Sequence, residues 1–586
     1  MRGATTLAAV LAVAVAATAD EGPLLELVHI AAGEGGSSGG HVALRLGDRA
    51  FHYQARHDGQ LRLKRDPWPA FLVHYNLLGN RSLARARLAL PPDRVTALEA
   101  RLDLLHAVEG RHRAVSKALA FERRVLEALA AGEEEAAVEG GGLFAGSLRA
   151  AAPEGDPHGL RLLAALDAAP GTSPDLPPVP RTSEPLPPLA LERDRYALTP
   201  DLAGERMRER LLLAAALDAI ARARPLAPGL LIAASERPLS PGERRWLRLG
   251  AVRLESRIAA LLGSRRPDRG HALLVATARH RAALASLGAG RLLTLDPFAS
   301  APLRPEDEGL RVSPEPLARL AADLGRAHEL LHAHTVASGV VGEGAWHALE
   351  TAAARLHEAE RSLALGSPLR VEDARPVPSR RGPLPLAVLG LGPPDPAALQ
   401  RARDNLQRYD AALAQLYDYD LLTRNCATEL AGLLGVADAP GAFVPALFFD
   451  AAARRLPVAD TRSVPSHRLR RLAAMRATTH PLWLQLREGN VLSSTLYGGA
   501  PEDGAFLFFT DDVFWPRPLY GAANLGYAAL YTGGGLLRAP FDGGETFVRG
   551  ARGVLFSLPE LAFANLRKGS FEYLPEVAAL WGAPRR

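Results

Sequence analysis

The fold of this chain is decided by residues 41–54, which read HVALRLGDRAFHYQ. Two runs of alternating apolar and polar residues, 41–46 and 50–54, lie on either side of a Gly-Asp-Arg turn, and this pattern is typical of a β-hairpin. A Gly/Ser-rich loop at 33–40 precedes the hairpin, and the apolar run 24–31 before that loop predicts a buried strand. This part of the chain therefore predicts an antiparallel sheet.

Further along, the sequence predicts more helix than strand. Residues 82–90 alternate like another strand, and a Pro-Pro-Asp start signal then predicts a helix from 91 to about 106. Helical periodicity also predicts helices over 315–335, 397–417 and 425–434.

The middle of the chain differs in composition from both ends. From about 108 to 400, helices rich in Ala, Leu, Arg and Glu alternate with Pro-rich linkers. Three apolar runs inside it, 229–235, 272–276 and 291–296, predict a small parallel sheet with crossover helices. No glycine-rich phosphate-binding motif follows the first run, so we expect no nucleotide site there. The segment 495–577 is rich in glycine and aromatic residues and predicts a small β-rich unit.

Together these patterns predict an α+β protein in five parts. They are a signal peptide, 1–19; a first part of the core, 20–107; a helix-rich insertion, 108–399; a second part of the core, 400–436; and a β-rich C-terminal region, 437–586. The signal peptide is indicated by Arg2, an Ala/Val/Leu run and an A-x-A site before Asp20, with an uncleaved anchor as the alternative. We therefore expect an exported protein of the periplasm or the cell envelope.

The composition excludes several classes of protein. Hydrophobic residues make up 48% of the 586 residues and charged residues 23%, which excludes disordered, collagen-like and polytopic membrane proteins. The net charge is +5, but no basic block alternates with aromatic residues, so nucleic acid is not an expected partner. The single cysteine, Cys426, can form no internal disulfide, which directs attention to its chemistry.

Cys426 stands where a polar segment gives way to a helix. Leu430 and Leu434 follow it at helical spacing, so the thiol is expected in the first turn. The N–H groups and the dipole of that turn would lower the pKa of the thiol. A nucleophilic cysteine needs, in addition, an imidazole that accepts its proton. A small buried side chain without chemistry is the alternative.

Two histidines of the hairpin are candidates for that imidazole. His41 begins a strand directly after the Gly/Ser-rich loop, so its ring can lie at the mouth of a cleft. His52 lies on the partner strand and could orient His41, as the third member of a catalytic triad does. Histidines with a purely structural or solvated role are the alternative at both positions.

Three segments of the chain resemble the Lnb-type N-terminal periplasmic domain family. Residues 38–46 are similar to its S-x-x-G-H-T-x-L-R strand, and residues 75–95 resemble a stretch with E-N-R-D followed by T-P-E. Residues 419–426 resemble its Y-x-F-h-x-x-N-C-S/T motif, where h is apolar. The family looks like a circular permutation of the NlpC/P60 papain-like thiol hydrolases. The chain departs from it by the long insertion and by the absence of the acidic residue after Asn80-Arg81.

The resemblance implies a thiol acyltransferase or hydrolase without a cofactor. Cys426 would be the nucleophile, His41 the general base and then acid, and Asn425 and the Cys426 N–H the oxyanion donors. The implied reaction moves a fatty acyl chain of a lipoprotein to an amine through a thioester, and water would make it a hydrolysis. The implied substrate is an envelope lipoprotein, a lipid or a cell-wall peptide, and a non-catalytic envelope scaffold is an alternative.

A second motif competes with the thiol. His328 and His332 form H-E-x-x-H with Glu329 between them, and their one-turn spacing puts both rings on one helix face, as zinc binding requires. Glu343 or Glu350 could complete the ligand set. A zinc metallopeptidase is therefore an alternative function, and an amphipathic helix with solvated histidines is the interpretation we favour.

Aromatic residues near the C-terminus could line an acyl-chain groove or contact a membrane peripherally, although a plain β core is the simpler expectation. They are Phe506, Phe508, Phe509, Phe514, Trp515, Tyr520, Tyr527 and Tyr531.

Overall fold

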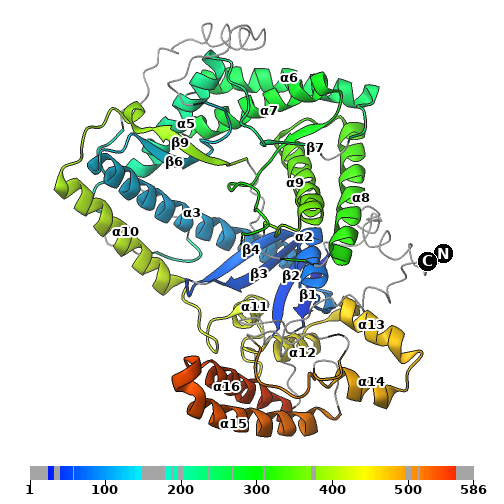
Figure 1. Cartoon of the computed structure of the whole chain (residues 1–586). Coiled ribbons are helices and arrows are strands. Elements are labelled where there is room, and N and C mark those ends of the chain that lie inside the picture. The colour runs from blue at the N-terminus through cyan, green and yellow to red at the C-terminus, as the bar shows by residue number, and fades with distance from the viewer. Residues whose placement is uncertain are drawn as a thin grey trace. The chain divides into compact units, whose positions relative to one another are not determined.

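The computed structural model of the protein places most of the chain in two compact units (Figure 1). Unit 1 comprises Met1–Arg111, Leu191–Tyr196 and Leu413–Arg586, and unit 2 comprises His112–Ala190 and Ala197–Ala412. The residues described are 24–31, 40–56, 58–146, 179–186, 191–195, 202–233, 236–264, 266, 268–307, 311–312, 314–370, 378–494, 496, 503–510 and 515–562. The expected signal peptide lies outside them. In these described ranges, no helix combines the length and apolarity needed to cross a bilayer.

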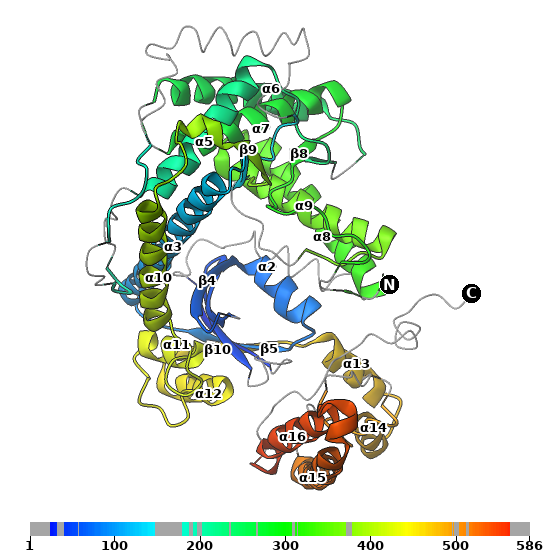
Figure 2. The ribbon, with the colours of Figure 1, turned by 60° about the vertical axis from the view of Figure 1, so that its left-hand side comes forward.

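Unit 1 is built on an antiparallel sheet of six strands in the order β10-β5-β1-β2-β3-β4 (Figures 1 and 2). The strands are β1 Leu25–Ile30, β2 His41–Leu46, β3 Arg49–Ala55, β4 Leu61–Pro67, β5 Leu83–Leu88 and β10 Val458–Val464. The four predicted strands, β1, β2, β3 and β5, are confirmed, and β4 and β10 are additions to them. In the hairpin, Leu44 pairs with Phe51 and the β3–β4 register pairs His52 with Lys64.

The two faces of the sheet are covered by different helices, as Figure 2 shows. Val42, Leu44 and Phe51 pack toward α11 (Cys426–Leu434), α12 (Pro445–Arg455) and the beginning of α3 (Pro92–Ala130). Ala43 and Ala50, one residue out of phase, pack toward α2 (Trp68–Leu72) and the π-helix η2 (Val73–Leu78). Because successive side chains of a strand alternate between the faces, the sheet is buried on both sides.

The helix that follows β5 is longer than expected. We predicted that it ends near His106, whereas α3 continues to Ala130. Gly110 lies inside the helix, and the chain leaves the helical path at Gly132, whose φ of +73° is left-handed. The intervening Ala, Leu, Glu and Arg residues are strong helix formers that give no stop signal.

The described part of the C-terminal region is mainly helical, so the prediction of a β-rich unit over 437–586 is wrong there. Beyond β10 the described residues form α13 (His467–Arg476), α14 (Pro481–Glu488), α15 (Arg517–Asp542), α16 (Glu545–Ser557) and η4 (Pro559–Ala562). The apolar run 505–509 makes an isolated bridge between Phe508 and Asn490. The runs around Gly526 and Thr546, interpreted as strands, belong to α15 and α16.

Glycines explain why this region is a helical hairpin. A Cβ added to Gly550 would lie 2.5 Å from the Oγ1 of Thr532, and one added to Gly535 would lie 2.5 Å from the backbone N of Phe547. The glycines therefore allow the backbones of α15 and α16 to approach closely. Their high frequency reflects close helix packing rather than turns between strands.

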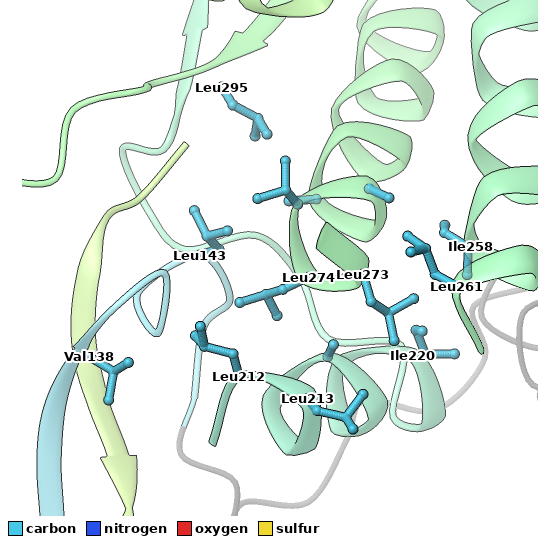
Figure 3. Packing of buried hydrophobic residues seen from close by; sticks show 14 of the residues in the cluster. Val138, Leu143, Leu212, Leu213, Ile220, Ile258, Leu261, Leu273, Leu274 and Leu295 are labelled. Atoms are coloured by element: carbon cyan, nitrogen blue, oxygen red, sulfur yellow. The ribbon is translucent and has the colours of Figure 1, made fainter. Parts of the chain in front are cut away.

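Unit 2 is mostly helical, as expected for the insertion. It contains the second half of α3 and most of α10 (Pro396–Leu416). The other helices are α5 (Ala203–Ala221), α6 (Pro241–Leu262), α7 (Arg269–Ala289), α8 (Pro314–Ser338) and α9 (Glu343–Leu365). Its core gathers side chains such as Leu212, Ile258 and Leu274 from different helices (Figure 3).

The small parallel sheet predicted for the insertion is absent from the described residues. The first and third apolar runs form β7 (Leu231–Ala233) and β8 (Leu293–Leu295), which pair antiparallel. The second run, 272–276, is part of α7, where it is buried in the core. A short apolar run is compatible with either a buried strand or a buried helix, and here the helix that encloses it decides. A second antiparallel pair is formed by β6 (Glu135–Glu139) and β9 (Arg381–Pro385).

Candidate active site

His41 enters the sheet through a backbone conformation that favours glycine. Gly40 has φ +90°, and a Cβ there would lie 3.1 Å from Nε2 of His29 and 3.2 Å from the carbonyl oxygen of Ile30. Glycine therefore avoids both the strain and the contact. His41 follows this glycine at the first position of β2, where its side chain is buried.

The structure joins His41 to His52 and, beyond it, to a carboxylate. Nε2 of His41 lies 3.0 Å from Nδ1 of His52, and Nε2 of His52 lies 2.9 Å from Oδ2 of Asp66. The predicted contact between the two histidines is thus present. Asp66 lies on β4, two residues from the cross-strand partner of His52, on the same face of the sheet.

The carboxylate determines which ring nitrogens carry protons. Ionised Asp66 only accepts hydrogen bonds, so the Nε2–H of His52 donates to it and Nδ1 of His52 becomes an acceptor. The Nε2–H of His41 then donates to that Nδ1. In this arrangement Nδ1 of His41 carries the lone pair, so it is the nitrogen that can accept a proton.

Aromatic and cationic side chains surround this chain of hydrogen bonds. The ring of Tyr75 stacks on His41, with centroids 5.4 Å apart. The guanidinium of Arg81 lies over the Tyr75 ring, 5.4 Å from its centroid. Burial, followed by the charges of His52 and Arg81, holds the pKa of His41 well below its ordinary value. His41 is therefore neutral at physiological pH and able to act as a base.

Cys426 begins α11, as predicted, and it is partly exposed. Backbone N–H groups of Val42 and Ala427 point to its sulfur and lower the pKa of the thiol, and the charge of Arg81 lowers it further. Burial outweighs these effects and raises the pKa to about 11. The expectation of a lowered thiol pKa is therefore wrong for this state, because desolvation disfavours the thiolate more than the helix end stabilises it.

The thiol and the imidazole lie on opposite faces of the sheet. Cys426 packs with Val42 on the face of α11, whereas His41 packs with Tyr75 on the face of η2. They are adjacent through the backbone at the beginning of β2, and the hydrogen-bond donors to the sulfur are N–H groups rather than the His41 ring.

Asn425 has a structural task that the sequence did not reveal. Its Oδ1 accepts the N–H groups of Ala427 and Thr428, which caps α11. Its Nδ2 donates to the carbonyl oxygens of Leu421 and Phe443. Both amide hydrogens are used, so the side chain has none to offer an oxyanion, and the expectation that it is an oxyanion donor does not fit this geometry.

The H-E-x-x-H motif lies on α8, and its two histidine rings are 5.9 Å apart. The third ligands proposed for zinc are engaged elsewhere: Glu350 makes a two-pronged ion pair with Arg279, at 2.8 and 2.7 Å, and Glu343 pairs with Arg257. Both histidines are buried, so the expectation that they are solvated is wrong, and burial lowers the pKa of His328 to about 4. Throughout the described part of the chain, no group of three or more His, Cys, Asp or Glu side chains could hold a metal. The alternative with Glu350 as a zinc ligand is therefore contradicted.

Asp66, Tyr75 and Arg81 are the members of this site that the sequence reasoning missed. Asp66 lies on a strand that was not predicted, and its position beside His52 depends on the register of β3 and β4. The alternating stretch LRLKRD at 61–66 was the signal that could have identified the strand.

A comparison of the chain with family models, with curated proteins and with solved structures finds no match. Function is therefore inferred from the residues and their geometry.

Proposed function

We propose that this protein is an exported cysteine-dependent acyltransferase or hydrolase of the cell envelope, with a circularly permuted papain-like core of the NlpC/P60 type. The observation that carries the proposal is the hydrogen-bonded chain His41–His52–Asp66. His41 begins β2, and the backbone N–H of the next residue, Val42, donates to the sulfur of Cys426. A thiol at a helix N-terminus near an oriented neutral imidazole is what nucleophilic cysteine chemistry requires.

In the proposed reaction the Cys426 sulfur attacks the carbonyl carbon of an ester or amide. The thiol proton passes to Nδ1 of His41, and the imidazolium formed is stabilised through His52 and the carboxylate of Asp66. Backbone N–H groups, including that of Cys426, face the developing oxyanion. His41 then protonates the leaving alcohol or amine, which leaves a thioester. An amine or water attacks the thioester, releases the acyl group and restores the thiol.

The thiol pKa of about 11 makes this a general-base mechanism. A resting thiolate–imidazolium pair is disfavoured, because burial raises the pKa of Cys426 and lowers that of His41. The proton therefore leaves the sulfur as the sulfur attacks. For that transfer the sulfur must reach the His41 ring around the beginning of β2, which requires a side-chain rotation when substrate binds.

Asp66 supplies a test with a matched control. The variant Asp66→Asn is expected to lower turnover ten- to a hundred-fold. The amide can donate to Nε2 of His52, which would move the ring proton of His52 to Nδ1 and that of His41 to its own Nδ1, so that Nδ1 of His41 could no longer accept a proton. Asp58→Asn, in the same β3–β4 hairpin, removes the exposed ion pair with Arg62 and is expected to leave turnover unchanged. Equal turnover in the two variants would remove Asp66 from the mechanism.

The acyl substrate is proposed on the resemblance of three segments to the Lnb-type family. Mass spectrometry of lipoprotein N-termini and of cell-wall fragments, after incubation with the parent protein or Cys426→Ala, tests it. A Cys426-dependent change in the lipoproteins supports acyl transfer, whereas a change confined to wall fragments supports amide cleavage. Activity that survives Cys426→Ala but is lost in His328→Ala would refute the thiol mechanism and place the reaction at the H-E-x-x-H motif of α8. If neither variant changes any product, a non-catalytic scaffold replaces the proposed enzyme.

A further inference from the structure

The outer side of α15 is apolar along most of its length. Leu519, Leu530, Leu537 and Phe541 are 68%, 80%, 81% and 90% exposed. In a helix with 3.6 residues per turn, these four positions lie within about 40° of one another around the axis. We call these four residues the α15 stripe.

The α15 stripe lies opposite the side of the helix that packs against α16. Ala528, Thr532 and Gly535 are the positions of α15 closest to Gly553, Gly550 and the backbone of Phe547. By the same helical geometry, these packed positions are centred about 170° from the stripe. Helix α16 therefore cannot cover the stripe. A helix that is apolar on both sides is normally buried on both sides, so the stripe needs a covering surface.

The charges around the stripe favour a lipid surface with anionic headgroups. The exposed positions of α15 between 519 and 541 are Leu, Ala, Gly, Pro and Phe, apart from the single charged residue Arg538. No acidic side chain on this side repels an anionic headgroup, and Arg538 attracts one.

Aromatic residues at the ends of the stripe fit the same surface. Trp515 precedes the first turn of α15 and is 64% exposed, and Phe541 lies in its last turn. Trp483, on α14, the helix that precedes α15 in the sequence, is 70% exposed. Tryptophan prefers the boundary between headgroups and acyl chains, where its ring is buried and its N–H stays hydrated.

We propose that the α15 stripe docks on an anionic lipid bilayer, with the axis of α15 parallel to the membrane plane. The leucines and Phe541 enter the boundary between headgroups and acyl chains, Arg538 contacts phosphate, and α16 supports the helix from the opposite side. The proposal does not depend on the chemistry of Cys426, because none of its residues belongs to the candidate active site.

Vesicle sedimentation of the full-length chain tests this docking. Vesicles of phosphatidylcholine mixed with an equal part of phosphatidylglycerol should bind the parent protein, and those of phosphatidylcholine alone should bind it more weakly. The double variant Leu530→Glu/Leu537→Glu should lower the partition coefficient by about ten-fold or more, since two apolar side chains leave the lipid. Leu330→Glu on α8, where the leucine is 64% exposed, is the matched control and should bind like the parent.

Circular dichroism establishes that the variants fold, and both replaced leucines are at least 80% exposed. Equal vesicle binding by the parent and the double variant would overturn the proposal. Sedimentation velocity tests for a second copy of the chain on the stripe. If the parent is an oligomer and the double variant a monomer, with no effect on vesicle binding, a second copy covers the stripe. If the parent binds vesicles only after removal of 563–586, the C-terminal segment of the chain covers it. Either outcome excludes lipid as the native occupant.

Discussion

Replacing Asn425 by alanine separates a capping role from a catalytic one. The Oδ1 atom accepts the N–H groups of Ala427 at 2.8 Å and Thr428 at 3.0 Å. The Nδ2 atom donates to the carbonyl oxygens of Leu421 at 2.6 Å and Phe443 at 2.9 Å. Loss of the cap costs about 1 kcal/mol. The two partly buried carbonyls together add about 1 kcal/mol, because water replaces only part of the lost donors.

Asn425→Ala should therefore destabilise α11 by about 2 kcal/mol, which corresponds to roughly a thirty-fold larger population of the open helix. Hydrogen exchange measured by mass spectrometry on peptides of α11 reads this population directly. Asn405→Ala is the matched control, since Asn405 is a buried asparagine of unit 2 that bonds the backbone of Glu184 and Leu186. It should accelerate exchange in unit 2 and leave α11 unchanged.

The opposite pattern would refute the capping role. If exchange in α11 is the same in Asn425→Ala and the parent, while acyl transfer falls a hundred-fold or more, the amide acts on the oxyanion. The hydrogen bonds assigned to Nδ2 would then not describe the reacting protein.

Three further predictions concern the thiol and the C-terminal hairpin. Alkylation of Cys426 by iodoacetamide should rise about ten-fold per pH unit from pH 7 toward the pKa of about 11, because only the thiolate reacts and burial raises this pKa; a flat profile between pH 5 and 8 would instead reveal a thiolate–imidazolium pair. Arg81→Met should slow the alkylation at pH 8, since the Arg81 charge lowers the thiol pKa. Gly550→Ala should destabilise the α15–α16 hairpin by about 1–3 kcal/mol, because its Cβ would lie 2.5 Å from Thr532. A Cβ added at Gly533 has no neighbour within 4 Å, so Gly533→Ala should stabilise the same hairpin by about 0.5–1 kcal/mol. Thermal unfolding followed by circular dichroism measures both variants. Equal melting temperatures would contradict the close packing at Gly550.

Local sequence patterns determined the elements whose periodicity or end signal lies within a few neighbouring residues. The alternation in 41–46 and 50–54 predicted β2 and β3, and the change from polar to apolar residues at Cys426 predicted the start of α11. These signals are local because the period of a strand and the cap of a helix involve neighbouring residues. The same patterns identified His41, His52 and Cys426 as candidate site residues, but not the distances between them.

Tertiary structure decided everything that depends on partners far away in the sequence. The register of β3 and β4 placed Asp66 beside His52, and the packing of α11 on β2 placed the Cys426 sulfur beside the N–H of Val42. Desolvation in that packing reversed the expected direction of the thiol pKa. The C-terminal glycines were misinterpreted for the same reason, since whether a glycine serves a turn or a close helix contact depends on the backbone that faces it. A sequence pattern records what each residue can do, and the packing of distant segments selects which of these the residue does.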